Sequence, residues 1–362
     1  MTTASPQRLP LLDGLRGIAA ISVMGYHFGH VYRVETLFER GYLFVDFFFL
    51  LSGFVLTLAL ESRPLASRSA RSFVRARIIR LWPMIAIGAL CGASVALVTR
   101  GQGHLEIALA LVLALAMIPV TGVRDVEAFP LNGPQWSLLF ELLANAAHAL
   151  LLRRLSTPIL LGLVGLAGVA ELLVILHYGS NTRGPNALDW YAGLPRVAFA
   201  YGLGICLGRL WRLGRLRQQS HWLVPFLLLS FWPIALYLGN AWLDDATGDA
   251  LSVLLVMPAL FWLAACSPEG RKASPILGAM GQISFPLYAV HLPILMLFAS
   301  FERSLPNGIA AVMTSLALAA LLGRSFERLH KTRTARPRKS DKETDGAPAT
   351  TLLVERDLRV EA

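Results

Sequence analysis

The sequence has little charge for its length. Only 15% of its 362 residues are Asp, Glu, Lys or Arg, whereas 55% are apolar and the mean hydropathy is +0.56. Soluble domains carry about 25% charged residues, so this composition excludes an ordinary water-soluble domain. The net charge of +10 does not indicate nucleic-acid binding, because most basic residues lie in loops and in the C-terminal tail. Orientation in a bilayer explains that placement.

Cysteine is also scarce. Cys91, Cys206 and Cys266 are isolated inside apolar segments, which gives neither a disulfide framework nor the spacing of metal ligands. They are interpreted as packing residues, and we expect no metal and no bound cofactor.

Long apolar stretches dominate what is present. A helix of about 20 mostly apolar residues spans the hydrocarbon layer. The sequence predicts eleven such segments, at 15–33, 43–60, 79–99, 105–121, 135–152, 158–177, 195–211, 222–240, 249–266, 279–300 and 308–323. The expected fold is therefore all-α, a polytopic transmembrane helix bundle.

Loop charge sets the expected orientation, because short cytoplasmic loops are enriched in Lys and Arg. The most basic connection holds Arg63, Arg68, Arg71, Arg75 and Arg77 and is placed in the cytoplasm. Membrane crossings counted from the N-terminus and from the C-terminus assign the same side to each loop only if one of the segments 79–99 and 105–121 does not cross. This predicts ten spans in the plasma (inner) membrane with both termini cytoplasmic. The expected parts are a cytoplasmic lead (1–14), a membrane domain (15–331) and a disordered basic and polar tail (332–362).

Ionisable residues inside the apolar segments are the candidates for function, since a charge at mid-membrane is costly. In the first segment, Arg16 and His27 are eleven residues apart, so they lie on nearly one helix face, roughly 16 Å from each other. Imidazole is the best general base near neutral pH. A purely structural role, with Arg16 reaching to the interface and His27 satisfied in the core, is equally compatible with the sequence.

The next two segments add further polar groups. Asp46 and Ser52 lie within an aromatic run, where an unpaired carboxylate is costly, so Asp46 needs a partner. A structural hydrogen bond and catalysis both remain open for Asp46. Arg77 and Arg80 are three residues apart at the cytoplasmic end of the following helix, a spacing that suits bidentate phosphate binding. They are equally explained as orientation signals.

Two polar stripes follow. Ser137, Glu141, Asn145 and His148 fall on one face of the helix predicted at 135–152. Serine and asparagine can join helices by hydrogen bonds, whereas a glutamate favours function.

The second stripe lies on the helix predicted at 279–300. Ser284, Tyr288 and His291 align there, between Pro286 and Pro293, which are expected to kink the helix and free carbonyl groups. For His291, catalysis and orientation of another group both remain open.

Together these motifs resemble the acyltransferase 3 family in the order in which the family has them. The matching motifs are Arg16 and His27, the Leu-Ser-Gly-Phe at 51–54, the Arg77 and Arg80 pair before Trp82-Pro83, Trp136-Ser137-Leu138 to Glu141, and Ser284/Tyr288/His291. The resemblance covers roughly residues 10 to 330. It implies transfer of an acyl group, commonly acetyl, from cytoplasmic acyl-CoA to a hydroxyl of a carbohydrate, a lipid-linked sugar or a glycosylated natural product.

The mechanism expected from this resemblance divides the residues by role. Arg16, Arg77 and Arg80 would hold the CoA phosphates. His27 would be the general base, with Glu141 orienting it or stabilising its imidazolium. Tyr288 and His291 would polarise the thioester carbonyl or position the acceptor. A covalent acyl-enzyme on His27 or Ser52 remains open, as does a different class of protein, a proton-coupled transporter or flippase of a glycan or lipid-linked substrate.

Overall fold

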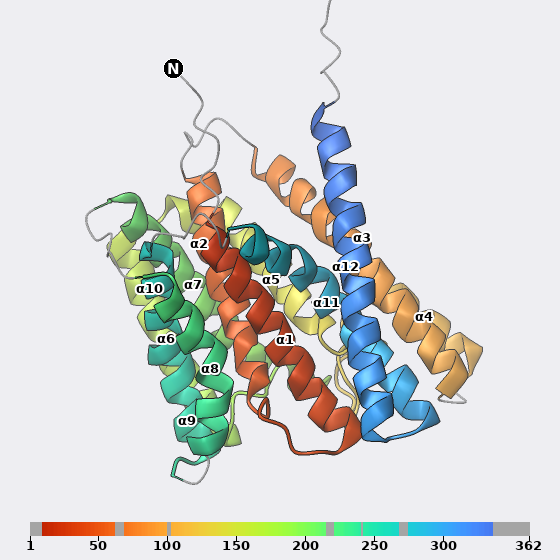
Figure 1. Cartoon of the computed structure of the whole chain (residues 1–362). Coiled ribbons are helices and arrows are strands. Elements are labelled where there is room, and N and C mark those ends of the chain that lie inside the picture. Colours follow the sequence, from red (N-terminus) through yellow and green to blue (C-terminus); the bar gives the residue numbers. More distant parts are fainter. Residues whose placement is uncertain are drawn as a thin grey trace, which may run out of the picture. The chain divides into compact units, whose positions relative to one another are not determined.

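A computed structural model describes residues 9–61, 69–99, 103–214, 221–239, 242–267 and 274–335 (Figure 1). The helices are α1 (Pro10–Tyr32), α2 (Phe44–Leu60), α3 (Ala70–Thr99), α4 (His104–Leu115), α5 (Gln135–Leu150), α6 (Thr157–Tyr178), α7 (Gly193–Arg212), α8 (Leu223–Gly239), α9 (Asp245–Leu251), α10 (Met257–Cys266), α11 (Ser274–Phe301) and α12 (Leu305–Ala335). Within these ranges the chain forms no strand beyond one isolated bridge between Glu127 and Asn186. The predicted all-α class is confirmed.

The chain divides into two units, residues 1–324 and 325–362, and the first contains all of the predicted site residues. The helix boundaries differ from the predicted parts at both ends. α1 begins at Pro10, inside the expected lead, and α12 continues past Thr332 to Ala335. Residues 1–8 of the lead and 336–362 of the tail lie outside the described residues, as do Arg63 and Arg68 of the basic connection.

Six of the described helical segments are long and apolar enough to cross a membrane. They are Gly41–Leu60, Ala70–Thr99, Thr157–Tyr178, Asp245–Cys266, Pro275–Phe301 and Leu305–Arg328. α4 has 12 residues, about 18 Å, which is too short to span the bilayer, whereas α3 has 30. This agrees with the prediction that one of those two segments does not cross. Ten spans and the sidedness of the termini stay predictions.

The helices approach closely because glycines line their contacts. A Cβ on Gly53 of α2 would collide with the Tyr201 carbonyl oxygen of α7, and one on Gly204 would collide with the Leu50 carbonyl oxygen. α1 meets α11 in the same way, since a Cβ on Gly14 would overlap the Leu277 side chain. Small residues at such contacts let helices pack by dispersion alone, which is the main source of cohesion between membrane helices.

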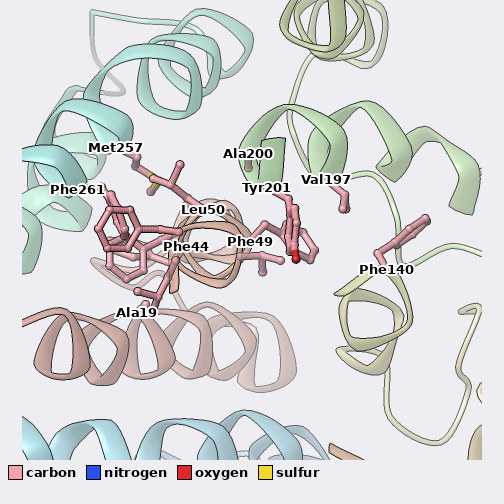
Figure 2. Close-up of a cluster of buried hydrophobic side chains, with 14 of the residues drawn as sticks. Ala19, Phe44, Phe49, Leu50, Phe140, Val197, Ala200, Tyr201, Met257 and Phe261 are labelled. Atoms are coloured by element: carbon pink, nitrogen blue, oxygen red, sulfur yellow. The ribbon is translucent and has the colours of Figure 1, made fainter. Parts of the chain in front are cut away.

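The aromatic run of α2 forms the centre of the core. Phe44, Phe47 and Phe54 have no exposed surface, and Phe54 meets Phe261 of α10 edge to face with ring centroids 5.2 Å apart. Figure 2 shows Phe261 and Met257 on one side of α2 and Tyr201 and Val197 of α7 on the other. The run therefore packs helices together, and this rigid core fixes α2 between α1, α7 and α10.

Candidate active site

The contact between α1 and α11 pairs predicted site residues of the two helices. Arg16 donates from Nε to Ser284 Oγ (2.8 Å) and from Nη2 to the Gly281 carbonyl (2.5 Å). Eleven residues later, His27 Nδ1 lies 3.1 Å from Nε2 of His291. Arg16 and His27 thus share one face of α1, as predicted. Because the later residue of α1 contacts the later residue of α11, the two helices run in the same direction (Figure 1).

The histidine pair has one consistent arrangement of protons. His291 is fully buried, and its Nδ1 lies 2.9 Å from the Leu287 carbonyl, which can only accept, so Nδ1 carries the proton and Nε2 is an acceptor. His27 Nδ1 lies 3.0 Å from the Val23 carbonyl and therefore donates to it and to His291 Nε2. The lone pair of His27 is then on Nε2. A neutral His27 held this way presents Nε2 as a base.

A cavity of about 1110 Å³ opens beside this pair. Its lining includes His27, Tyr26 and His30 of α1, Tyr288 of α11, and Trp136 and Arg196 from α5 and α7. Loop residues 125–134 and 182–186 contribute much of the remaining wall. The cavity lies at the C-terminal end of α1, and a volume of this size accommodates a substrate with several rings.

Tyr288 and the start of α5 form part of the cavity wall. The Tyr288 hydroxyl lies 2.7 Å from Ser137 Oγ, and Ser137 Oγ donates to the Pro134 carbonyl at 3.0 Å. Just before this turn, Asn132 Nδ2 donates to the Ala289 carbonyl at 2.9 Å. Pro293 cannot donate to that carbonyl, so Asn132 satisfies the group that the proline frees. The polar stripe of α11 therefore anchors the loop before α5.

Glu141 lies elsewhere. It accepts a 2.9 Å hydrogen bond from Ser52 Oγ, and its charge interacts with those of Arg16 and Arg77. The expectation that Glu141 orients His27 is therefore wrong, because α5 turns this carboxylate toward α2 and toward the arginines. His291 occupies the place beside His27 instead.

The three arginines predicted to bind phosphate gather at the end of the bundle opposite the cavity. Arg80 is within electrostatic range of both Arg16 and Arg77, and none of the three lines the cavity. Arg80 is exposed, and Arg77 is half-buried with its guanidinium 5.4 Å from the centre of the Phe73 ring. The helical rise puts Arg16 roughly 16 Å from His27. The predicted residues thus form two clusters, one of cations and one of histidines.

Asp46 has the partner that its burial requires. Arg196 of α7 donates to both Asp46 carboxylate oxygens, at 2.8 to 3.0 Å, and the two side chains are 4% and 2% exposed. Arg196 also donates to the Asn181 and Tyr42 carbonyls. Arg196 is not among the residues predicted from the sequence, although it lies near the start of the apolar segment 195–211, where a charge is costly. The pairing with Asp46 holds the side chain of Arg196, which lines the cavity.

The rest of the α5 stripe joins helices. Asn145 accepts a hydrogen bond from the Tyr201 hydroxyl at 2.9 Å, and His148 Nε2 lies 3.2 Å from the Glu61 carboxylate. Glu61 in turn accepts from Arg209 at 2.8 Å. These contacts tie α5 to α2 and α7 and fix the direction in which Ser137 and Glu141 point.

Comparison with known proteins identifies the family of this chain. A family model described as an acyltransferase domain matches residues 9–324. Protein 2 in the picA locus of Rhizobium radiobacter is 33% identical over 168 residues, which are 41% of this chain and 85% of that relative. No solved structure matches. The matched range covers most of the chain and includes every motif that resembles the acyltransferase 3 family. The chain therefore belongs to this family and is a membrane acyltransferase.

Proposed function

We propose that this acyltransferase moves an acyl group, expected to be acetyl, from cytoplasmic acyl-CoA to a hydroxyl of a carbohydrate or glycosylated acceptor, with His27 as general base. One observation supports this most directly. His27 stands in the cavity wall with Nδ1 engaged by the Val23 carbonyl and His291, which leaves Nε2 as its basic atom.

The chemistry follows from that arrangement. Nε2 of His27 takes the proton of the acceptor hydroxyl as its oxygen attacks the thioester carbonyl. The carbon–sulfur bond then breaks, the CoA thiolate leaves, and the proton passes from His27 to the thiolate sulfur. While His27 is an imidazolium, the Val23 carbonyl and His291 Nε2 accept hydrogen bonds from its Nδ1–H and stabilise the charge. His291 is a positioning residue in this scheme, because it acts through His27.

The donor enters from the arginine end. Arg16, Arg77 and Arg80 form a cationic cluster suited to the phosphates of CoA, and guanidinium groups bind phosphate oxygens bidentately. Glu141 lies among these arginines, where it limits their mutual repulsion and holds Ser52. The pantetheine arm of CoA, a long unbranched chain, would carry the thioester the roughly 16 Å from Arg16 to His27.

Tyr288 stands between the two ends. Its hydroxyl donates to Ser137 and lines the cavity, so it can accept a hydrogen bond from the acceptor, or turn from Ser137 to donate to the thioester carbonyl oxygen. Aromatic contact with Phe48 at 5.5 Å and burial at 5% exposure hold the ring rigidly.

The test is incorporation of radiolabelled acetyl-CoA by membranes that contain wild type, His27→Ala or His104→Ala, supplied with extracted surface glycan and lipid-linked sugars. We expect wild type and the control to form an alkali-labile ester, because His104 is exposed at the start of α4 and lies outside the cavity lining. His27→Ala should lose about 100-fold or more, the usual contribution of a general base.

Two outcomes would contradict the proposal. Equal transfer by His27→Ala and wild type would remove His27 from the mechanism. If wild type forms no ester from acetyl-CoA or from longer acyl-CoAs, while it moves a glycan across vesicle membranes, the transporter or flippase alternative replaces the enzyme.

A further inference from the structure

We propose that the acceptor is an acidic saccharide, whose carboxylate or phosphate is bound by Arg33 and Arg303 at the rim of the cavity while its hydroxyl lies at His27. This inference rests on the proposed function and adds the charge class of the acceptor.

The two arginines differ from the others in the cavity wall. Arg196 is paired with Asp46, and Arg183 donates to Asp189 at 2.9 Å. Arg33 and Arg303 also line the cavity, yet neither makes an ion pair or hydrogen bond through its side chain with any residue that the structure describes. Two cations are therefore available to a ligand in the same cavity.

Their position along the helices suits a bound saccharide. Arg33 follows His27 by six residues at the end of α1, which corresponds to about 9 Å along the helix axis. Arg303 follows the end of α11, and α11 runs in the same direction as α1. Both cations therefore lie beyond the histidine pair on the same side of it. An anionic group on a sugar next to the acylated one reaches Arg33, and Arg303, twelve residues after His291, lies further along the same side.

The backbone supports a role for the Arg33 side chain. Arg33 ends α1 with φ 57° and ψ 44°, in the left-handed region, where glycine or asparagine is the usual residue. Asp125, another lining residue, has φ 55°. Arginine seldom adopts this conformation, whereas aspartate tolerates it. The end of α1 therefore fixes the backbone of Arg33 at the cavity rim.

The experiment compares matched acceptors. Purified protein in nanodiscs of neutral lipid receives acetyl-CoA and one of four acceptors: a hexuronic-acid oligosaccharide, its carboxyl-reduced form, a phosphorylated hexose oligosaccharide, or its dephosphorylated form. The readout is the ratio of kcat/KM for each anionic acceptor to that for its neutral counterpart. The proteins are wild type, Arg33→Gln, Arg303→Gln and Arg124→Gln.

We expect wild type to prefer one anionic acceptor, and each rim variant to lower that ratio about tenfold, since a charge-assisted hydrogen bond is lost. Arg33→Gly should lower it equally while it keeps the left-handed turn, because glycine adopts that conformation without strain. Arg124→Gln should keep the wild-type ratio, since Arg124 is exposed next to Asp125 but does not line the cavity.

Equal use of charged and neutral acceptors by wild type would overturn this inference and leave the O-acyltransferase proposal intact. So would rim variants that change activity only when anionic lipid is added, because the arginines would then bind lipid headgroups. A wild-type protein that acylates none of the four acceptors nor any extracted glycan would refute the proposed function, and this inference with it.

Discussion

Replacement of Arg196 by Met should destabilise the protein by about 3–5 kcal/mol. Arg196 is 2% exposed and donates to both oxygens of Asp46 and to the Asn181 and Tyr42 carbonyls. Without it, the one side chain among the described residues that still donates to the buried carboxylate is Asn181, whose Nδ2 lies 3.4 Å from Oδ2. Breaking a buried pair by removing one partner typically costs this much, because the remaining charge is uncompensated.

Adding the substitution Asp46→Asn separates the effect of the uncompensated charge from simple loss of packing. In the double variant Asp46→Asn/Arg196→Met the uncompensated charge is gone, so more than half of the lost stability should return. Arg183→Met is the matched control. Arg183 pairs with Asp189 but is 26% exposed, and ion pairs of that kind contribute about 0–1 kcal/mol.

The chain supplies its own probe for the measurement. Cys206 and Cys266 form no disulfide and are only 6% and 7% exposed, so they react with a thiol-specific fluorophore as the protein unfolds on heating. The midpoints should rank wild type and Arg183→Met highest, then the double variant, then Arg196→Met. A single variant that melts with wild type, or a double variant no more stable than the single, would refute the argument from the buried charge.

Three further predictions concern other parts of the molecule. His291→Gln should lower kcat about 10- to 100-fold with little change in KM for acyl-CoA, because it loosens His27 without touching the donor; an unchanged kcat at saturating substrates would contradict the orienting role. Arg80→Lys should raise KM for acyl-CoA severalfold, because lysine cannot make the bidentate contact of arginine with phosphate. Arg75→Lys, on another face of α3, should leave KM unchanged, and equal KM values for both variants would count against phosphate binding. Gly204→Val should prevent accumulation of folded protein because its side chain meets the Leu50 carbonyl, whereas Gly162→Ala, which faces open space, should behave as wild type in size-exclusion chromatography.

The sequence predicted the helices well where hydropathy alone defines them. The segments expected at 158–177 and 279–300 correspond to α6 (Thr157–Tyr178) and α11 (Ser274–Phe301). The ends of the bundle were predicted less well. α3 begins at Ala70 and α12 ends at Ala335, because charged residues continue a helix once water solvates them, and hydropathy does not register such turns.

For the site, spacing along one helix predicted which residues share a face, and it succeeded for Arg16 with His27 and for the α11 stripe. It did not predict which neighbouring helix each side chain meets. Glu141 illustrates this limit. Its place in a stripe with Ser137 does not predict that its hydrogen-bond partner is Ser52 on α2. Arg196 was not predicted because it shares no polar stripe with other residues of its helix, although its charge in an apolar segment is itself a signal. Pairing across helices depends on the packing of the whole bundle.

The separation of the two clusters constrains the order of events under the proposed function. The arginines and the cavity lie at opposite ends of α1, so donor and acceptor need not compete for one entrance. The acceptor hydroxyl and the thioester carbonyl still have to meet beside His27, because its Nε2 is the proposed base. A direct transfer then requires both substrates to be bound at once, and initial rates at varied donor and acceptor should give intersecting reciprocal plots. Parallel plots would instead require an acyl group to wait on the protein, and Ser52 lies against Glu141 on the donor side of His27, where such an intermediate would form.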